Sequence, residues 1–169
     1  RTTKGSEFQV NTNTTGYQYN PSVAMDSAGD FVVSWTSNQE GSGPGIYAQR
    51  YNSSGVAQGS EFLVNTYTLG DQNQQSVAMD SLGNFVVSWK SSSSQDGSGY
   101  GIYAQRYNAD GSKPTTNGSE FLVNTYTTNG QYQPSVAMDS AGDFVVAWQD
   151  YGNYNAGIFN KRYSSTGLQ

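Results

Sequence analysis

The sequence predicts an all-β chain made of three copies of one four-stranded unit. Three tryptophans are separated by intervals of 54 and 59 residues, and the same two intervals separate three phenylalanines and three methionines. These markers are Trp35, Trp89 and Trp148, Phe8, Phe62 and Phe121, and Met25, Met79 and Met138. Twenty glycines and many Asn, Ser and Thr residues indicate frequent short turns, whereas strong helix formers are sparse. Both observations favour β-structure.

The first half of each unit reads as a β-hairpin. In the first unit we expect strands at residues 21–26 and 31–35, because apolar and polar residues alternate there with a period of two. The alternation places Phe31 and Trp35 on one face of the second strand. Gly29, in the turn between the strands, supplies the positive φ that a tight hairpin needs.

The second half of each unit supplies two more strands. Residues 46–51 and 61–66 are rich in β-branched and aromatic side chains, as strands usually are. In the first of these strands Ile46, Ala48 and Arg50 alternate with Tyr47, Gln49 and Tyr51. The connection from Tyr107 to Glu120 is three residues longer than its counterpart in the first unit, in a stretch where insertions are well tolerated.

Four strands in a repeat of this length are typical of the blades of a β-propeller. A β-solenoid and a sandwich are the alternatives, but a solenoid coil is about half as long, and a sandwich gives no reason for three similar units. We therefore expect a single repeat domain over residues 1–169. Its units are residues 13–66, 67–125 and 126–169, and residues 1–12 form a fourth-strand segment that completes a blade.

The position of that segment predicts assembly. Residues 5–12 match a fourth strand, while residues 166–169 match residues 55–58, which precede the fourth strand of the first unit. The third unit is therefore expected to lack a fourth strand, and the spare strand is expected to complete a blade of another copy. Because propellers usually have four to eight blades, two chains in head-to-tail contact would give six. If the rotation does not close, the same contact builds a filament.

Composition excludes several classes of function. The net charge is −5, and eight scattered Lys and Arg residues do not form the cationic patch that nucleic acid requires. The sequence contains no long apolar run, so it does not predict a membrane-spanning segment. The absence of Cys and His removes disulfides, thiolate nucleophiles, imidazole bases and the usual zinc ligands.

Four runs of residues indicate a resemblance. They are SVAMD at 76–80, GNFVVSW at 83–89, GIYAQRY at 101–107 and EFLVNT at 120–125. These runs resemble tandem repeats of large secreted proteins of bacteria, cyanobacteria included, which often carry adhesion and calcium-binding modules nearby. The resemblance implies a secreted or cell-surface location and a part in adhesion.

Residues that recur in every unit are the candidates for a repeated ligand site. Sugars stack their C–H faces on aromatic rings while charged side chains bind their hydroxyl groups. This design is similar to that of fucose-binding propeller lectins, although their strand motifs are absent here. The predicted ligand-binding residues are Trp35 with Arg50 and Glu61, Trp89 with Arg106 and Glu120, and Trp148 with Arg162 and Glu7. The alternative is that the tryptophans pack in the core and the arginines pair with carboxylates.

Recurring carboxylates could in principle serve glycoside hydrolysis, which uses a pair of them. Active sites rarely recur three times in one chain, so we expect Asp26, Asp80 and Asp139 to cap hairpin turns instead, and we expect no enzyme. The loop at residues 95–100 and its counterparts at 40–43 and 150–153 each hold one acidic residue. Plain turns are expected there, with weak calcium binding as the alternative, and no cofactor.

These observations predict a non-catalytic extracellular module that binds glycans at repeated, equivalent sites. The alternative is a structural or adhesive repeat of a bacterial surface protein that assembles with itself and has no small-molecule ligand.

Overall fold

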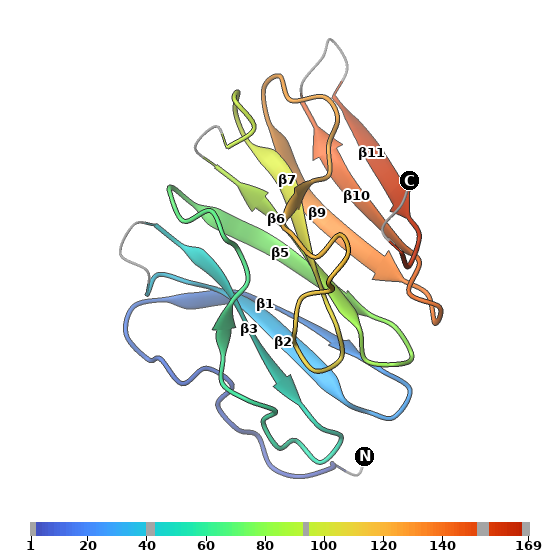
Figure 1. The fold of residues 1–169 in the computed structure, drawn as a ribbon. Coiled ribbons are helices and arrows are strands. Elements are labelled where there is room, and N and C mark those ends of the chain that lie inside the picture. The colour runs from blue at the N-terminus through green and yellow to red at the C-terminus, as the bar shows by residue number, and fades with distance from the viewer. Residues whose placement is uncertain (1–2, 40–42, 93–94, 152–155, 167–169) are drawn as a thin grey trace.

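The computed structural model describes residues 3–39, 43–92, 95–151 and 156–166. Their strands form three antiparallel sheets, in which neighbouring strands follow one another in sequence (Figure 1). The first sheet contains β1 (Gln18–Met25), β2 (Phe31–Ser37), β3 (Gly45–Tyr51) and β4 (Phe62–Leu63). The second contains β5 (Gln72–Met79), β6 (Phe85–Ser91), β7 (Gly101–Tyr107) and β8 (Phe121–Leu122), and the third β9 (Gln131–Met138), β10 (Phe144–Asp150) and β11 (Gly157–Tyr163). The all-β prediction and the repeat are confirmed.

Aspartate caps the first hairpin of every sheet, as the sequence indicated. The Oδ1 atom of Asp26 accepts hydrogen bonds from the backbone N–H groups of Ala28 (2.8 Å) and Asp30 (2.9 Å). Asp80 and Asp139 make the corresponding pairs of bonds. Gly29 has a φ of 90°, a conformation that an L side chain rarely adopts.

The first strand of each sheet is longer than expected and is bulged. The pairing register of β1 with β2 shifts between Tyr19 and Ser22, and Asn20 has a φ of 52°. The same conformation recurs at Gln74 and Gln133. An extra residue in one strand breaks the alternation of side chains, so the period-two pattern revealed only the part of the strand beyond the bulge.

The fourth strand is much shorter than expected. Only Phe62 and Leu63 pair with β3, and the next backbone bond runs from the N–H of Val64 to the carbonyl of Ile46 (2.8 Å). The side chain of Asn65 then takes over, because its Oδ1 atom accepts the N–H of Ile46 (2.7 Å). Asn124 and Ile102 repeat this bond at 2.7 Å in the second sheet.

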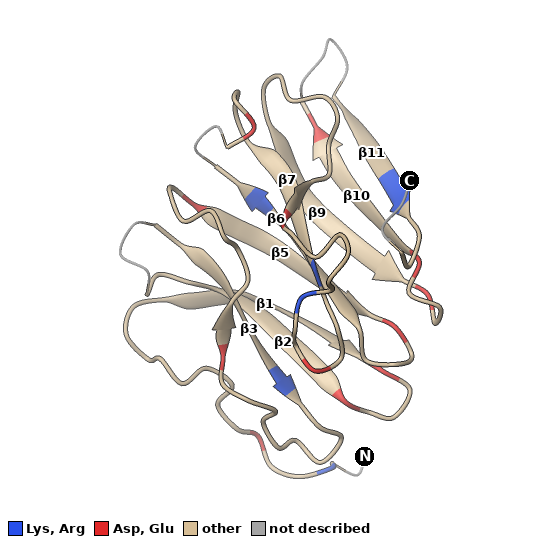
Figure 2. Ribbon diagram, in the orientation of Figure 1, with Lys and Arg blue, Asp and Glu red and all other residues tan. Residues whose placement is uncertain are grey.

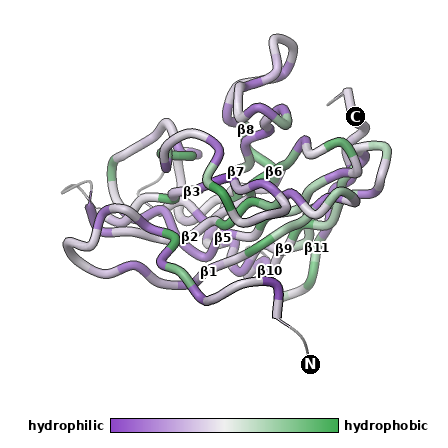
Figure 3. Tube along the Cα trace, turned by 90° about the horizontal axis from the view of Figure 1, so that it is seen from below, coloured by the Kyte–Doolittle hydropathy of each residue, from purple (hydrophilic) through white to green (hydrophobic). Residues whose placement is uncertain are grey.

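The sheets stack face to face and bury two apolar clusters between them. We call the face that carries Val32, Ala48 and Arg50, or their equivalents, the forward face, and the opposite face the rear face. The forward face of the first sheet packs on the rear face of the second, and the forward face of the second packs on the rear face of the third. The first cluster joins Val32, Ile46, Ala48 and Val64 to Val77, Phe85, Val87, Trp89, Tyr103 and Tyr107. The second joins Ala78, Val86, Ile102, Ala104 and Val123 to Val136, Phe144, Val146, Trp148 and Tyr163. Figure 3 shows that many of the apolar stretches follow the strands between which these clusters lie.

Residues 5–12 form no regular strand and lie against the rear face of the first sheet. Phe8 contacts Tyr51 with ring centroids 5.2 Å apart, and the Tyr51 hydroxyl donates to the carbonyl of Val10 (3.1 Å). The same contacts join the first sheet to the second through Phe62, Tyr107 and Val64. The segment therefore lies where the fourth strand of a preceding sheet would lie. In Figure 1 it is at the opposite end of the stack from β11.

Within the described residues, the third sheet has the strand order β11-β10-β9, so β11 pairs with β10 alone. No helix in the described part of the chain is long and apolar enough to cross a membrane. Lys and Arg are spread over several strands and loops, with Lys161 and Arg162 adjacent on β11, rather than gathered in one patch (Figure 2).

The central sheet should be the most sensitive to loss of core volume. Trp89 is fully buried, and its Nε1 atom donates to Oε1 of Gln72 (3.1 Å). We expect Trp89→Ala to lower the free energy of unfolding by about 3–5 kcal/mol, through a cavity and an unpaired amide oxygen. The midpoint of urea denaturation measures this loss. Tyr17→Ala is the control, because Tyr17 is 77% exposed, and equal losses in the two variants would contradict the assignment.

Candidate functional site

The three recurring tryptophans lie in the core, on the rear faces of their sheets. Trp35, Trp89 and Trp148 are 4%, 0% and 6% exposed. Trp35 stacks on Tyr47, and Trp148 stacks on Phe159, with ring centroids 6.4 Å apart in both pairs. The indole rings are therefore packed between side chains rather than presented at a rim.

The arginines lie on the other face of the sheet. Arg50 is paired across the strands with Val32, whereas Trp35 is paired with Tyr47, so the two side chains point to opposite sides. The same register separates Arg106 from Trp89 and Arg162 from Trp148. The structure thus does not bring the tryptophan and arginine of one repeat together as the predicted pair.

Two of the arginines join successive sheets. Arg50 donates to the carbonyl of Ala109 in the second sheet, and Arg106 donates to the carbonyl of Ser165 in the third. The acceptors are backbone carbonyls rather than the carboxylates of the alternative interpretation. Burial lowers the pKa of Arg106, and nearby Asp80 opposes this shift. Arg162 occupies the same position in the third sheet and is exposed.

The glutamates link the end of one fourth strand to the next. Glu61 accepts the backbone N–H of Thr12 (2.6 Å), and Glu120 accepts the N–H (2.6 Å) and the hydroxyl (2.8 Å) of Thr66. The second oxygen of Glu120 accepts a bond from Gln95 (2.6 Å). Glu7, the equivalent residue before the first sheet, is exposed.

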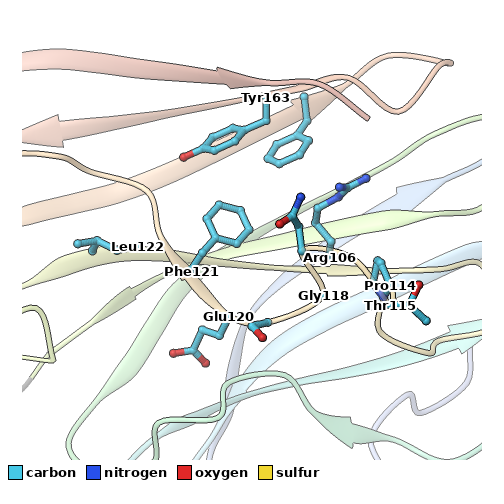
Figure 4. A pocket seen from close by; sticks show the side chains of 11 residues that line it. Arg106, Pro114, Thr115, Gly118, Glu120, Phe121, Leu122 and Tyr163 are labelled. Carbon is cyan, nitrogen blue, oxygen red and sulfur yellow. The ribbon is translucent and has the colours of Figure 1, made fainter. Parts of the chain in front are cut away.

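One cavity brings two of the predicted residues together. It has a volume of about 610 Å³ and lies between the second and third sheets, where Arg106 and Glu120 line it with Phe121, Phe144 and Tyr163. The connection between β7 and β8 forms its rim through residues 114–119. Figure 4 shows Tyr163 above Phe121, with the carboxylate of Glu120 pointing away from the guanidinium of Arg106.

Aromatic rings form the base of this cavity. Phe144 stacks on Tyr163 at 4.7 Å, Phe121 is tilted against Tyr163 at 5.3 Å, and the guanidinium carbon of Arg106 lies 5.8 Å from the centre of the Phe144 ring. The Tyr163 hydroxyl is buried and has no hydrogen-bond partner among the described residues. Its equivalents on Tyr51 and Tyr107 donate to backbone carbonyls. Burial raises the pKa of Tyr163 to about 12.

The repeats are not equivalent around their arginines. A cavity borders Arg50 between the first two sheets, but its volume is only about 60 Å³. The sequence identified Arg106 and Glu120 and missed Phe121 and Phe144 as lining residues. The available signal was the three-residue insertion between Tyr107 and Glu120, because that insertion lies in the connection that rims the cavity.

A second polar cluster surrounds Tyr103 in the same sheet. Burial raises the pKa of Tyr103 to about 12, and the charges of Asp96 and Glu120 add to the increase. Asp96 caps its turn by accepting the N–H of Ser98 (3.1 Å), while its Oδ2 atom is buried and has no hydrogen-bond partner among the described residues.

Of the three loops considered for calcium, only the one at residues 95–100 lies wholly within the described residues. No group of three acidic, His or Cys side chains in the described part of the chain is arranged to hold a metal ion. Residues 40–42 and 152–155, in the corresponding loops of the other units, lie outside the described residues. Weak calcium binding stays a prediction.

Comparison with known proteins identifies the fold. No family model matches the chain, and neither does any curated protein. Solved structures that are similar include an endo-arabinase from Bacteroides thetaiotaomicron VPI-5482, with 15% identity, a TM-score of 0.53, and coverage of 88% of this chain and 57% of that one. An α-L-arabinofuranosidase from Lactobacillus brevis matches with 11% identity, a TM-score of 0.53, and coverage of 93% and 55%. A protein of unknown function from Dyadobacter fermentans DSM 18053 matches with 13% identity, a TM-score of 0.61, and coverage of 90% and 39%.

The fold is of the propeller type. The three sheets are thus blades, and the chain spans less than two thirds of the length of each of these three structures. Completion of a ring by a second chain stays a prediction.

The expectation that the chain is not an enzyme is contradicted. Two of the similar structures are arabinose-processing glycosidases, so the absence of His and Cys does not exclude catalysis on this fold. The physical reason is that glycoside hydrolysis uses a pair of carboxyl groups and needs neither imidazole nor thiol.

The buried tyrosines predict a loss of stability at alkaline pH. Tyrosines of the unfolded chain lose their protons near pH 10, whereas Tyr103 and Tyr163 keep theirs until about pH 12. The unfolded state therefore binds fewer protons in this interval, and the free energy of unfolding falls as pH rises from about 10 to about 12. Denaturant midpoints at pH 9 and pH 11.5 measure the slope. Tyr163→Phe should make it shallower, and an unchanged slope would refute the contribution of that hydroxyl.

Proposed function

We propose that the cavity between the second and third blades binds a carbohydrate. The observation that carries the proposal is the set of groups lining one space of about 610 Å³: the guanidinium of Arg106 beside the rings of Phe121, Phe144 and Tyr163. This volume is within the range of about 300–1,000 Å³ that small-ligand sites occupy. Rings that accept sugar C–H faces, with a few polar groups at their edge, are the usual composition of such a site.

Polar groups of the cavity suit the hydroxyl groups of a sugar. A guanidinium has five N–H donors, and the contact with Ser165 uses one of the donor nitrogens of Arg106. The Tyr163 hydroxyl has no partner among the described residues, so a ligand that bonds to it would remove the cost of an unpaired buried group. A sugar placed over Phe121 would contact both.

The proposed ligand class is an arabinose-containing polysaccharide. Support comes from the two similar structures that are named as an endo-arabinase and an α-L-arabinofuranosidase. A secreted or cell-surface location, which the sequence resemblance predicts, fits a polymeric ligand outside the cell. Because only one cavity of this size borders a recurring arginine between two blades of the described chain, we propose one principal site rather than three equivalent ones.

Calorimetric titration with arabino-oligosaccharides tests this proposal. Arg106→Ala should weaken binding at least tenfold, because it removes the charged donor from the cavity. Arg50→Ala is the matched control, since it removes the equivalent contact between blades where the cavity is only about 60 Å³. Binding should be unchanged in that variant. No binding by the wild-type chain, or equal losses in the two variants, would refute the site.

The comparisons favour glycoside hydrolysis as a second candidate function. Both named glycosidases share this fold, and the second blade holds two carboxylates, Asp96 and Glu120, whose charges both add to the raised pKa of Tyr103. Glu120 also lines the carbohydrate cavity. Two carboxyl groups near one substrate can serve as acid and as base or nucleophile.

Release of reducing ends from arabinan tests the second candidate. If the chain hydrolyses the polymer, Glu120→Gln and Asp96→Asn should each lower the rate at least a hundredfold, because each removes one member of the pair. Asp139→Asn is the control, since Asp139 caps a turn in the third blade. Activity that survives in Glu120→Gln would exclude this pair, and binding without any release of reducing ends would leave carbohydrate binding as the function.

A further inference from the structure

We infer that the third blade binds the first blade of a second copy of this chain. The open forward face of the third blade and its β11 edge would receive the rear face of the partner's first blade together with the partner's residues 5–12. Two such contacts would close two copies into a ring of six blades. The contacts between the first and second blades, and between the second and third, show which residues should meet across this interface.

The forward face of the third blade lacks the cover that its equivalents have. Ile158 is 76% exposed, whereas Ile46 and Ile102 at the same position are fully buried. A space of about 730 Å³ borders Arg162 and Phe144 on this blade. The corresponding space at Arg50, which the second blade covers, has a volume of about 60 Å³.

At the opposite end of the stack, the rear face of the first blade is exposed. Val23 and Met25 on the first blade are each 62% exposed, whereas Val77 and Val136, the counterparts of Val23, are 6% and 9% exposed because a blade packs on them. Residues 5–12 already lie on this end in the place of a preceding fourth strand. Among the described residues, no strand pairs with residues 5–12, and β11 pairs with β10 alone.

The register of the missing strand follows from the first blade. There Tyr47 pairs with Leu63 and Ala48 pairs with Phe62. The equivalent pairs across the interface are Phe159 with the partner's Gln9 and Asn160 with the partner's Phe8. The partner's Val10 would donate its N–H to the carbonyl of Ile158.

Polar contacts between successive blades predict equivalent contacts between the two copies. Arg50 donates to Ala109 and Arg106 to Ser165, so Arg162 should donate to the carbonyl of the partner's Ser53. Glu61 accepts the N–H of Thr12 and Glu120 that of Thr66. The partner's Glu7 should therefore accept the N–H of Thr125, which lines an open space of about 420 Å³ beside Phe159.

The open face is more polar than the buried ones. Asn160 stands where the other blades have Ala48 and Ala104. A polar residue makes an exposed face tolerable in the free chain and weakens the packing when the face is covered. We therefore expect an association that reverses on dilution.

Cysteine cross-linking tests the register, because the chain has no cysteine of its own. Gln9→Cys and Phe159→Cys are made in separate chains, which are then mixed and oxidised. Since these positions should pair across the interface, a covalent dimer should form in the mixture and in neither variant alone. Mixing Gln9→Cys with Asn160→Cys is the matched control, because a one-residue shift places the second cysteine on the other face of the strand. Equal cross-linking in both mixtures would overturn the register.

The mass in solution tests the contact itself. Light scattering should give twice the chain mass of 18.2 kDa at high concentration. Ile158→Lys should return the mass to that of one chain and leave the urea midpoint unchanged, since Ile158 is exposed in the single chain. Leu69→Lys, a change at a 61% exposed position away from both ends, should remain a dimer. A monomeric wild type would overturn the proposal, and a mass above two chains would overturn closure into a six-blade ring.

Discussion

The structure depends on a ring contact that recurs wherever one blade meets the next. Tyr107 at the end of β7 stacks on Phe85 of its own blade at 4.9 Å and meets Phe62 of the preceding blade at 5.3 Å. Its hydroxyl donates to the carbonyl of Val64, so a single residue fixes both the distance and the register between two sheets. Tyr51 and Tyr163 make the same ring contacts with Phe8 and Phe121. Apolar burial supplies the attraction, and the hydroxyl bond, where it forms, restricts how the sheets can slide.

The cavity proposed to bind carbohydrate is a variant of that contact rather than a separate structure. Around Tyr163 the two ring contacts are kept, but the hydroxyl has no partner among the described residues, and the connection that lines the space is three residues longer. The added loop at residues 114–119 surrounds a space instead of filling it. A change in one surface connection, where insertions cost little, thus converts a packed junction into a cavity without disturbing the sheets.

The proposed assembly uses the same contact once more. Phe8 already meets Tyr51 from the position of a preceding fourth strand, so the first blade carries its half of a junction without the blade that would complete it. Ile158 and Arg162 form the other half on the third blade. Association of copies would therefore require no surface that the chain does not already use internally, which is why the register can be stated residue by residue.

The sequence by itself determined the repeat, the strand order, and the turn role of Asp26 and its equivalents. These features are local, because alternation and turn residues act over a few positions. It also identified Arg106 and Glu120 as candidates. Only the tertiary structure decided that Trp89 is core and that Arg106 reaches the next blade, since one blade's strand pattern does not reveal which face meets a neighbour. The lining of the cavity by Phe144, and the replacement of a backbone acceptor by Asn65, were likewise settled only in three dimensions. Such contacts join residues far apart in the chain, and their geometry follows from how the sheets pack.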